Sequence, residues 1–204
     1  MSGKNLRKVR AILAGGLVLG VGAAVTLAAW NDSEFAQGTF TAGSFNVQGS
    51  NNGTDYADHE AAGGGLKLTF GNVTDNLSAN ETVYASYWLR LAKGSTTGGT
   101  LQPAGVTVAE AAGVSDNADA ISYVINQVPA GGSCGPGVGT QVASGTDLRS
   151  QTAGTVRGVP LVAGANGAEG PAVQLCIAVT AGDETAFDQG LSTTATWQFD
   201  AVSG

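Results

Sequence analysis

A strict alternation of residue types near the C-terminus limits the folds open to this chain. Across residues 191–201 the two alternating sets are Leu191, Thr193, Ala195, Trp197, Phe199 and Ala201, and Ser192, Thr194, Thr196, Gln198 and Asp200. The first set is mainly apolar and the second is wholly polar. A repeat of two residues places successive side chains on opposite faces of a strand, whereas a helix repeats every 3.6 residues. The segment therefore predicts a half-buried β-strand with one polar face.

The same alternation recurs at two further places. In residues 82–91 the two faces carry Val83, Ala85, Tyr87, Leu89 and Leu91, and Tyr84, Ser86, Trp88 and Arg90. In residues 171–180 the apolar face carries Val173, Leu175, Ile177 and Val179. Shorter or less regular alternation predicts further strands at residues 39–47, 66–70, 106–109, 121–128, 139–143 and 155–162.

Glycine-rich segments separate these predicted strands, and a polar loop is predicted over residues 48–65. Helical turns fit only residues 107–113 and 183–189. Many short strands without helical crossovers are typical of an antiparallel β-sandwich. The chain shows no internal repeat and no long linker, so we predict a single all-β domain over residues 30–204.

The first 29 residues have the organisation of an export signal. Lys4, Arg7, Lys8 and Arg10 precede an apolar run over residues 11–29, which ends in small residues. This order predicts a signal helix that is cleaved between Ala29 and Trp30. A run of 19 residues can also span a bilayer, so a retained membrane anchor is the alternative. The glycines within the run and its small-residue exit favour cleavage.

Cleavage changes the charge of the remaining domain. Residues 30–204 hold five basic and sixteen acidic residues, a formal charge of −11 against −7 for the whole chain. Because nucleic-acid phosphates are bound mainly through Lys and Arg, this balance argues against a nucleic-acid partner. It also disfavours docking on an anionic membrane, which leaves an uncleaved signal as the predicted membrane contact. A large charge of one sign keeps copies apart until a specific contact overcomes the repulsion.

The two cysteines, Cys134 and Cys176, both follow the predicted signal. In an exported chain an even pair predicts a disulfide, and two unpaired thiols are the alternative. Cys176 alternates with the apolar residues of its predicted strand, so we expect it to face a covering loop that carries Cys134. Neither cysteine belongs to a Cys-x-x-Cys motif, which argues against redox catalysis.

The sequence offers little catalytic machinery. His59 is the only histidine and lacks the second histidine, four residues on, of zinc metalloproteases. No Gly-x-Ser-x-Gly elbow and no phosphate-binding glycine loop is present. Short acidic clusters at residues 55–60, 116–119 and 183–188 lack EF-hand spacing, and we interpret them as solvated loop acids, with a calcium loop as the alternative. We therefore predict no catalytic, metal or cofactor-binding residue and no enzyme activity.

Two segments around the predicted cleavage site carry a family resemblance. Residues 26–32 read Thr-Leu-Ala-Ala-Trp-Asn-Asp, and residues 38–47 read Gly-Thr-Phe-Thr-Ala-Gly-Ser-Phe-Asn-Val. They resemble the N-terminus of substrates of the SipW-type signal peptidase, the TasA and camelysin family of secreted biofilm matrix proteins. The polar segment at residues 76–83 and Trp197 in the last strand match the family in layout. The glycine-rich middle and the cysteine pair depart from it.

The resemblance implies an exported jelly-roll β-sandwich that assembles into fibres by donor-strand exchange. In such assembly the freed N-terminal segment of one subunit completes the sheet of the next. Here the donor would be residues 30–40, with Trp30, Phe35 and Phe40 as apolar plugs. The alternative is that this segment frays or folds back onto its own sheet.

The resemblance also implies a place and a set of partners. It implies an extracellular, cell-surface or biofilm-matrix location, with other copies or other matrix and cell-surface components as partners. A monomeric accessory or adhesive module is the alternative function. A camelysin-like metalloprotease is disfavoured because the zinc signature is missing.

Overall fold

The computed structural model describes residues 5, 8–13, 37, 42–71, 77–109 and 115–204. The chain divides into two units, Met1–Thr41 and Ala42–Gly204. In the first unit residues 8–13 are helical. The predicted cleavage site at Ala29 and Trp30 and the plugs Phe35 and Phe40 lie outside the described residues. In the part of the chain that is described, no helix combines the length and apolar character needed to cross a membrane.

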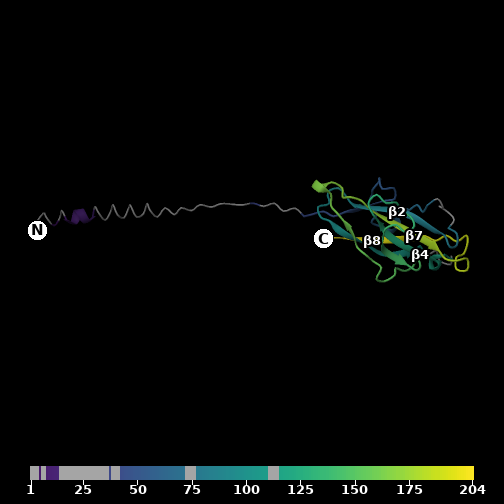
Figure 1. The fold of residues 1–204 in the computed structure, drawn as a ribbon. Coiled ribbons are helices and arrows are strands. Elements are labelled where there is room, and N and C mark those ends of the chain that lie inside the picture. Colours follow the sequence, from purple (N-terminus) through teal and green to yellow (C-terminus); the bar gives the residue numbers. More distant parts are fainter. Residues whose placement is uncertain (1–4, 6–7, 14–36, 38–41, 72–76, 110–114) are drawn as a thin grey trace. The chain divides into compact units, whose positions relative to one another are not determined.

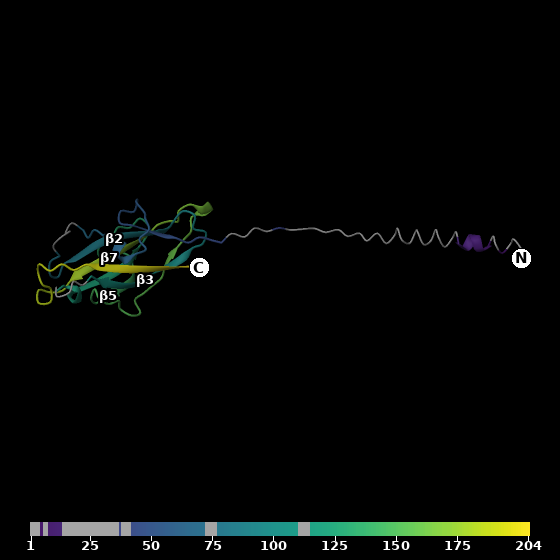
Figure 2. The ribbon, with the colours of Figure 1, turned by 180° about the vertical axis from the view of Figure 1, so that it is seen from behind.

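The second unit is all-β and has two antiparallel sheets, which confirms the predicted fold class (Figures 1 and 2). In spatial order, the larger sheet consists of β1 (Val47–Ser50), β2 (Thr82–Leu91), β7 (Val173–Ala181), β4 (Ile121–Val128) and β5 (Thr140–Gly145). The smaller sheet consists of β6 (Val159–Leu161), β3 (Gly99–Val108) and β8 (Ala195–Ser203). The 3₁₀ turns of the described residues are η1 (Ala62–Gly64), η2 (Ala118–Ala120) and η3 (Ala165–Gly167).

The core lies between the apolar faces of the two sheets. At its centre Ala85 of β2, Ile177 of β7 and Ile125 of β4 are paired side by side, and each is at most 1% exposed. The smaller sheet covers them with buried residues that include Leu101, Val159 and Leu161. Removal of this apolar surface from water is the main force that holds the sheets together.

Several strand predictions are confirmed by the structure. Residues 82–91 and 121–128 form β2 and β4 with the predicted bounds. β7 and β5 differ from the predicted segments by one or two residues at each end. The predicted turn after β7 is also present, because the amides of Ala186 and Phe187 both donate to the Asp183 carbonyl, at 3.1 and 3.0 Å. In β2 and β7 the predicted apolar set faces the core.

The strand prediction for residues 66–70 is wrong. Leu66, Leu68 and Phe70 are half-buried and the residues between them are exposed, so the alternation reports burial correctly. The segment is not a strand, however, and no described strand pairs with it. Its backbone is held instead by single bonds, from Asn51 Nδ2 to the Lys67 carbonyl at 3.0 Å and from the Gly71 amide to the Tyr84 carbonyl at 3.0 Å. Burial on one face is thus not sufficient for a strand.

Other predicted boundaries are also wrong. β1 begins at Val47, so residues 42–46 of the segment predicted at 39–47 are not a strand, and β1 continues into the predicted loop. β8 begins at Ala195 rather than at residue 191, and β6 covers only three residues of the segment 155–162. Thr107 and Val108 belong to β3 and not to a helical turn. β3 itself is ten residues long and contains a register shift between Pro103 and Gly105.

Candidate functional site

The longest uncovered strand edge of the described residues belongs to β8. This nine-residue strand pairs with β3, and no described strand pairs with its other side. Figure 2 shows it running beside β3 to the C-terminus. An edge strand presents unpaired N–H and C=O groups to which a further strand can add. The β8 edge is therefore a candidate site for strand addition.

The other sheet edges are short or covered by the chain. At β1, Gly49 and Ala57 form a bridge through two backbone bonds of 2.9 and 3.1 Å. At β5, the amides of Thr152 and Arg157 donate to the carbonyls of Ser144 and Val142, at 2.8 and 2.9 Å. β6 has three residues and includes a proline, which cannot donate a ladder bond. Proteins commonly protect sheet edges in these ways, and among the described residues neither a backbone bridge nor a proline protects the outer edge of β8.

A cluster of aromatic side chains lies beneath β8. The ring of Phe199 is 5.5 Å from that of Tyr87 on β2, and the ring of Trp197 is 5.8 Å from that of Tyr123 on β4. Phe70 lies 6.2 Å from Trp197. Of these five residues only Tyr123 is fully buried. The smaller sheet has three strands and the larger sheet has five. The aromatic side chains beside β8 therefore remain partly exposed.

The residues that lead into β1 are fastened at the same end of the sandwich as the C-terminus. The Thr96 and Ala92 amides donate to the carbonyls of Ser44 and Asn46, both at 2.9 Å. The Phe45 ring fills the space above Gly99, where a Cβ atom would lie 2.7 Å from it. The Gly204 amide donates to the Gly98 carbonyl at 3.1 Å. Residues 44–46 therefore lie next to the start of β3 and the end of β8.

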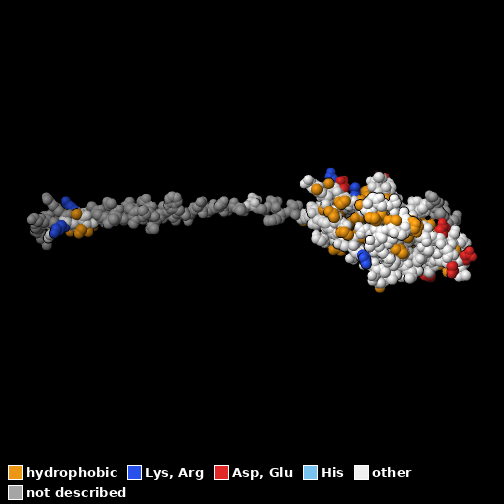
Figure 3. Space-filling view, viewed as in Figure 1, with side chains coloured by type: hydrophobic (Ala, Val, Ile, Leu, Met, Phe, Trp, Pro, Cys, Tyr) orange, Lys and Arg blue, Asp and Glu red, His pale blue; other side chains and the backbone are white. Residues whose placement is uncertain are grey.

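The acidic clusters form local turns and surface contacts. Arg149 contacts Asp116 at 2.8 Å and Asp119 at 2.9 Å. Hydrogen bonds from Thr185 lower the pKa of Asp183. Figure 3 shows acidic side chains at the end of the domain where the loop after β7 lies in Figure 1. Within the described ranges, no group of three or more His, Cys, Asp and Glu side chains is placed to hold a metal ion.

His59 has no reacting partner in the described part of the chain. It is half-buried in the loop after β1, and its Nδ1 atom is buried without a hydrogen-bond partner. Its neighbour Asp58 accepts a bond from Asn46 Nδ2 at 3.0 Å. A general base needs a hydrogen-bonded nucleophile and an orienting group, and neither accompanies His59 here.

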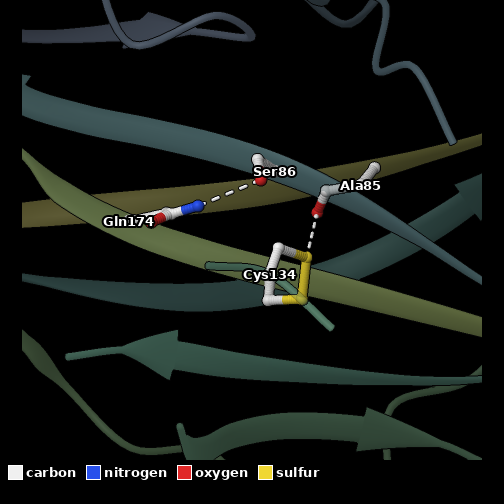
Figure 4. The surroundings of a disulfide bond; sticks show 5 residues. Ala85, Ser86, Cys134 and Gln174 are labelled. Atoms are coloured by element: carbon white, nitrogen blue, oxygen red, sulfur yellow. Dashed lines mark hydrogen bonds between the residues drawn. A yellow bond between two sulfur atoms is a disulfide. The ribbon is translucent and has the colours of Figure 1, made fainter. Parts of the chain in front are cut away.

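Cys134 and Cys176 form a disulfide with a Cα–Cα distance of 5.1 Å. Cys176 lies on the face of β7 that points away from the core, as its position in the alternation predicts. Figure 4 shows the bond next to Ala85, Ser86 and Gln174. It ties the loop after β4 to the outer face of the larger sheet.

Tyr123 makes the fold sensitive to alkali. Burial, followed by the negative charge of Asp147, raises the pKa of Tyr123 to about 12. Its hydroxyl donates to the Ser150 carbonyl at 3.2 Å. In the unfolded chain the Tyr123 hydroxyl ionises near pH 10. The stability that the folded state gains from holding this hydroxyl neutral is therefore complete below about pH 10 and is lost between about pH 10 and pH 12. Across this range the free energy of unfolding should fall by at most about 1.4 kcal/mol per pH unit.

Urea unfolding at a series of pH values measures this slope. Tyr123→Phe should be less stable at neutral pH, since it lacks the bond to Ser150, but should lose less stability above about pH 10. Burial also raises the pKa of Tyr87, so the slope should decrease rather than vanish. An unchanged slope in Tyr123→Phe would contradict this assignment.

The described residues thus bring together an open strand edge and an aromatic cluster. Sequence alternation identified Trp197 and Phe199 as core residues of the last strand, but not the absence of a neighbour for that strand. Tyr87 and Phe70 join the cluster through packing between distant segments, for which the sequence contains no local signal. No protein-family model and no curated protein sequence matches this chain.

Proposed function

We infer that this chain is a secreted, non-catalytic structural protein whose copies join by adding a strand to the β8 edge. The observation that supports this most strongly is the open edge of β8 above the partly exposed aromatic cluster. The Cys134–Cys176 disulfide suits an oxidising compartment outside the cytosol. The resemblance of residues 26–47 to TasA and camelysin-type matrix proteins points in the same direction.

Strand addition explains how such copies could join despite their like charge. Main-chain hydrogen bonds along the added strand supply affinity, and alternate side chains fill apolar space beneath the edge. In this proposal residues 30–40 of one copy form the added strand. Trp30 and Phe40, which share one face of a regular strand, cover the aromatic cluster of the next copy, and Phe35 plugs apolar space on the opposite face. A head-to-tail contact that does not close on itself propagates as a filament.

Electron microscopy of residues 30–204 tests the proposal. This protein is expected to form filaments, and a version without residues 30–40 is expected to remain monomeric. Replacing Trp30, Phe35 and Phe40 together by serine keeps the donor length and should also abolish filaments. The N-terminus of the secreted chain, determined by mass, checks cleavage after Ala29.

A mixing experiment separates donor from acceptor. The version without residues 30–40 retains the β8 edge, so small amounts of it should bind filament ends and shorten the filaments. A protein of residues 30–204 that stays monomeric over a wide concentration range would overturn the fibre proposal. That result would favour the accessory or adhesive module, which pull-down from the cell surface would then test.

A further inference from the structure

A groove lies on the outer face of the larger sheet, away from the β8 edge. It has a volume of about 560 Å³. Ser86 and Trp88 of β2 and Gln174 of β7 line its floor, and residues 131–134 of the loop after β4 form a wall. None of the lining side chains is ionisable, since Cys134 is bonded to Cys176. The groove is therefore neutral in a strongly acidic chain.

Trp88 is held in place by the loop after β1. A Cβ atom at Gly53 would lie 3.2 Å from the indole of Trp88, so the two are packed together. The Gly53 amide donates to the Oγ atom of Ser50, a fully buried residue, at 2.9 Å. Further along the loop, the Tyr56 ring lies 4.0 Å from the guanidinium carbon of Arg90. The half-buried indole is thus a fixed aromatic surface that still lines the groove.

Two polar side chains beside the indole, Ser86 and Gln174, are held in place but do not use all of their hydrogen-bonding groups. Gln174 lies directly across from Trp88 in the β2–β7 register, and its Nε2 atom donates to Ser86 Oγ at 3.0 Å (Figure 4). A glutamine amide has two N–H donors and a carbonyl acceptor, and a serine hydroxyl can donate as well as accept. After their mutual bond, each side chain retains hydrogen-bonding capacity toward the groove.

The disulfide makes the groove wall rigid. Cys134 is bonded to Cys176 on β7, and the Gly132 amide closes a turn onto the Pro129 carbonyl at 2.9 Å. A Cβ atom at Gly132 would lie 2.9 Å from a Val128 side-chain carbon, so the wall is packed closely against the end of β4. A wall fixed before binding reduces the conformational entropy that a ligand must overcome.

We propose that this groove binds a neutral oligosaccharide. A pyranose ring has one face of C–H groups, which carry partial positive charge and are attracted to the negative face of an indole. Its hydroxyl groups both donate and accept, which matches the unsaturated groups of Gln174 and Ser86. The neutral lining offers no cation to an anionic polymer, and the charge of the domain repels one. This inference goes beyond the proposed fibre role and does not depend on it.

Calorimetric titration of the full disulfide-bonded chain tests the inference. The probes are cellohexaose, maltohexaose and chitohexaose, with oligogalacturonate as the anionic comparison. We expect at least one neutral probe to bind with a dissociation constant of roughly 0.1–1 mM, as an open groove with few polar contacts allows. Oligogalacturonate should not bind. Binding should also change the tryptophan fluorescence of the protein.

Variants assign the binding to the groove. Trp88→Ala should weaken it by at least about tenfold, and Gln174→Ala by about fivefold. Gln198→Ala, which truncates an exposed glutamine on β8, should leave it unchanged. Thermal unfolding checks that each variant folds. If Trp88→Ala does not fold, the affinity of Gln174→Ala shows whether the oligosaccharide binds in the groove. Absence of binding by all three neutral probes at about 10 mM, equal binding of oligogalacturonate, or full affinity in Gln174→Ala would overturn the inference.

Discussion

Replacement of Cys134 and Cys176 by alanine is expected to lower the free energy of unfolding by about 3–4 kcal/mol. The bond links residues 42 positions apart, and loss of the link lets the unfolded chain explore many more conformations. Cys176 is also 1% exposed, so its truncation removes contacts from a buried position. For a domain of this size the melting temperature should fall by roughly 6–16 °C.

Reduction of the unsubstituted protein provides the matched control. Thermal unfolding in the presence of a thiol reductant should lower its melting temperature to a similar extent, whereas the same reductant should not affect the double alanine variant. Equal melting temperatures for the oxidised protein and the variant would show that the bond contributes little. The oligosaccharide affinity should also fall in the variant, because the wall of the groove is then no longer fixed.

Ile177→Ala is expected to destabilise the domain by about 2–5 kcal/mol. Ile177 is fully buried on β7, and it lies between Ala85 and Ile125 in neighbouring strands. Truncation leaves a cavity at the point where the packing of both sheets meets. Urea unfolding monitored by tryptophan fluorescence measures the loss.

Val202→Ala on β8 is the control for this variant. Val202 is 71% exposed, so its truncation should change stability by no more than about 0.5 kcal/mol. A similar loss in both variants would mean that β-strand propensity, rather than cavity formation, dominates. A loss below about 1 kcal/mol in Ile177→Ala would contradict the central position of this residue in the core.

The parts of the fold that depend on local alternation could be predicted from the sequence. Alternate residues of β2 and β4, such as Ala85 and Leu89 in one strand and Tyr123 and Ile125 in the other, are buried in the core. The orientation of Cys176 followed from the same alternation, since a residue between Leu175 and Ile177 must point the other way. A disulfide to the covering loop was therefore predictable without knowledge of the sheet order.

The first half of β3 escaped prediction because its residues usually interrupt strands. A Cβ atom at Gly99 would lie 2.5 Å from the Val202 carbonyl oxygen and 2.7 Å from the Phe45 ring, and Pro103 and Gly105 flank a register shift. The prediction for residues 66–70 was wrong for the opposite reason, because these residues alternate but do not pair with a described strand. Both cases are decided by contacts with segments distant in sequence, which no local pattern contains.

The candidate sites were less predictable than the fold. The open edge of β8 depends on which strands lie beside it, and the groove depends on two loops that approach β2 from different parts of the chain. Trp88 was placed correctly on the face opposite the core. Its surroundings, Gly53 and Gln174, could not be inferred from its own segment.

Protection of the β1 and β5 edges has a consequence for the geometry of any assembly. Under the proposed strand addition, a subunit with one unprotected long edge among its described strands accepts one incoming strand, and its N-terminal segment enters one neighbour. Such a subunit makes one incoming and one outgoing connection, so it extends an unbranched chain and cannot create a branch point. Networks built from it would need a second kind of contact to link one thread to another.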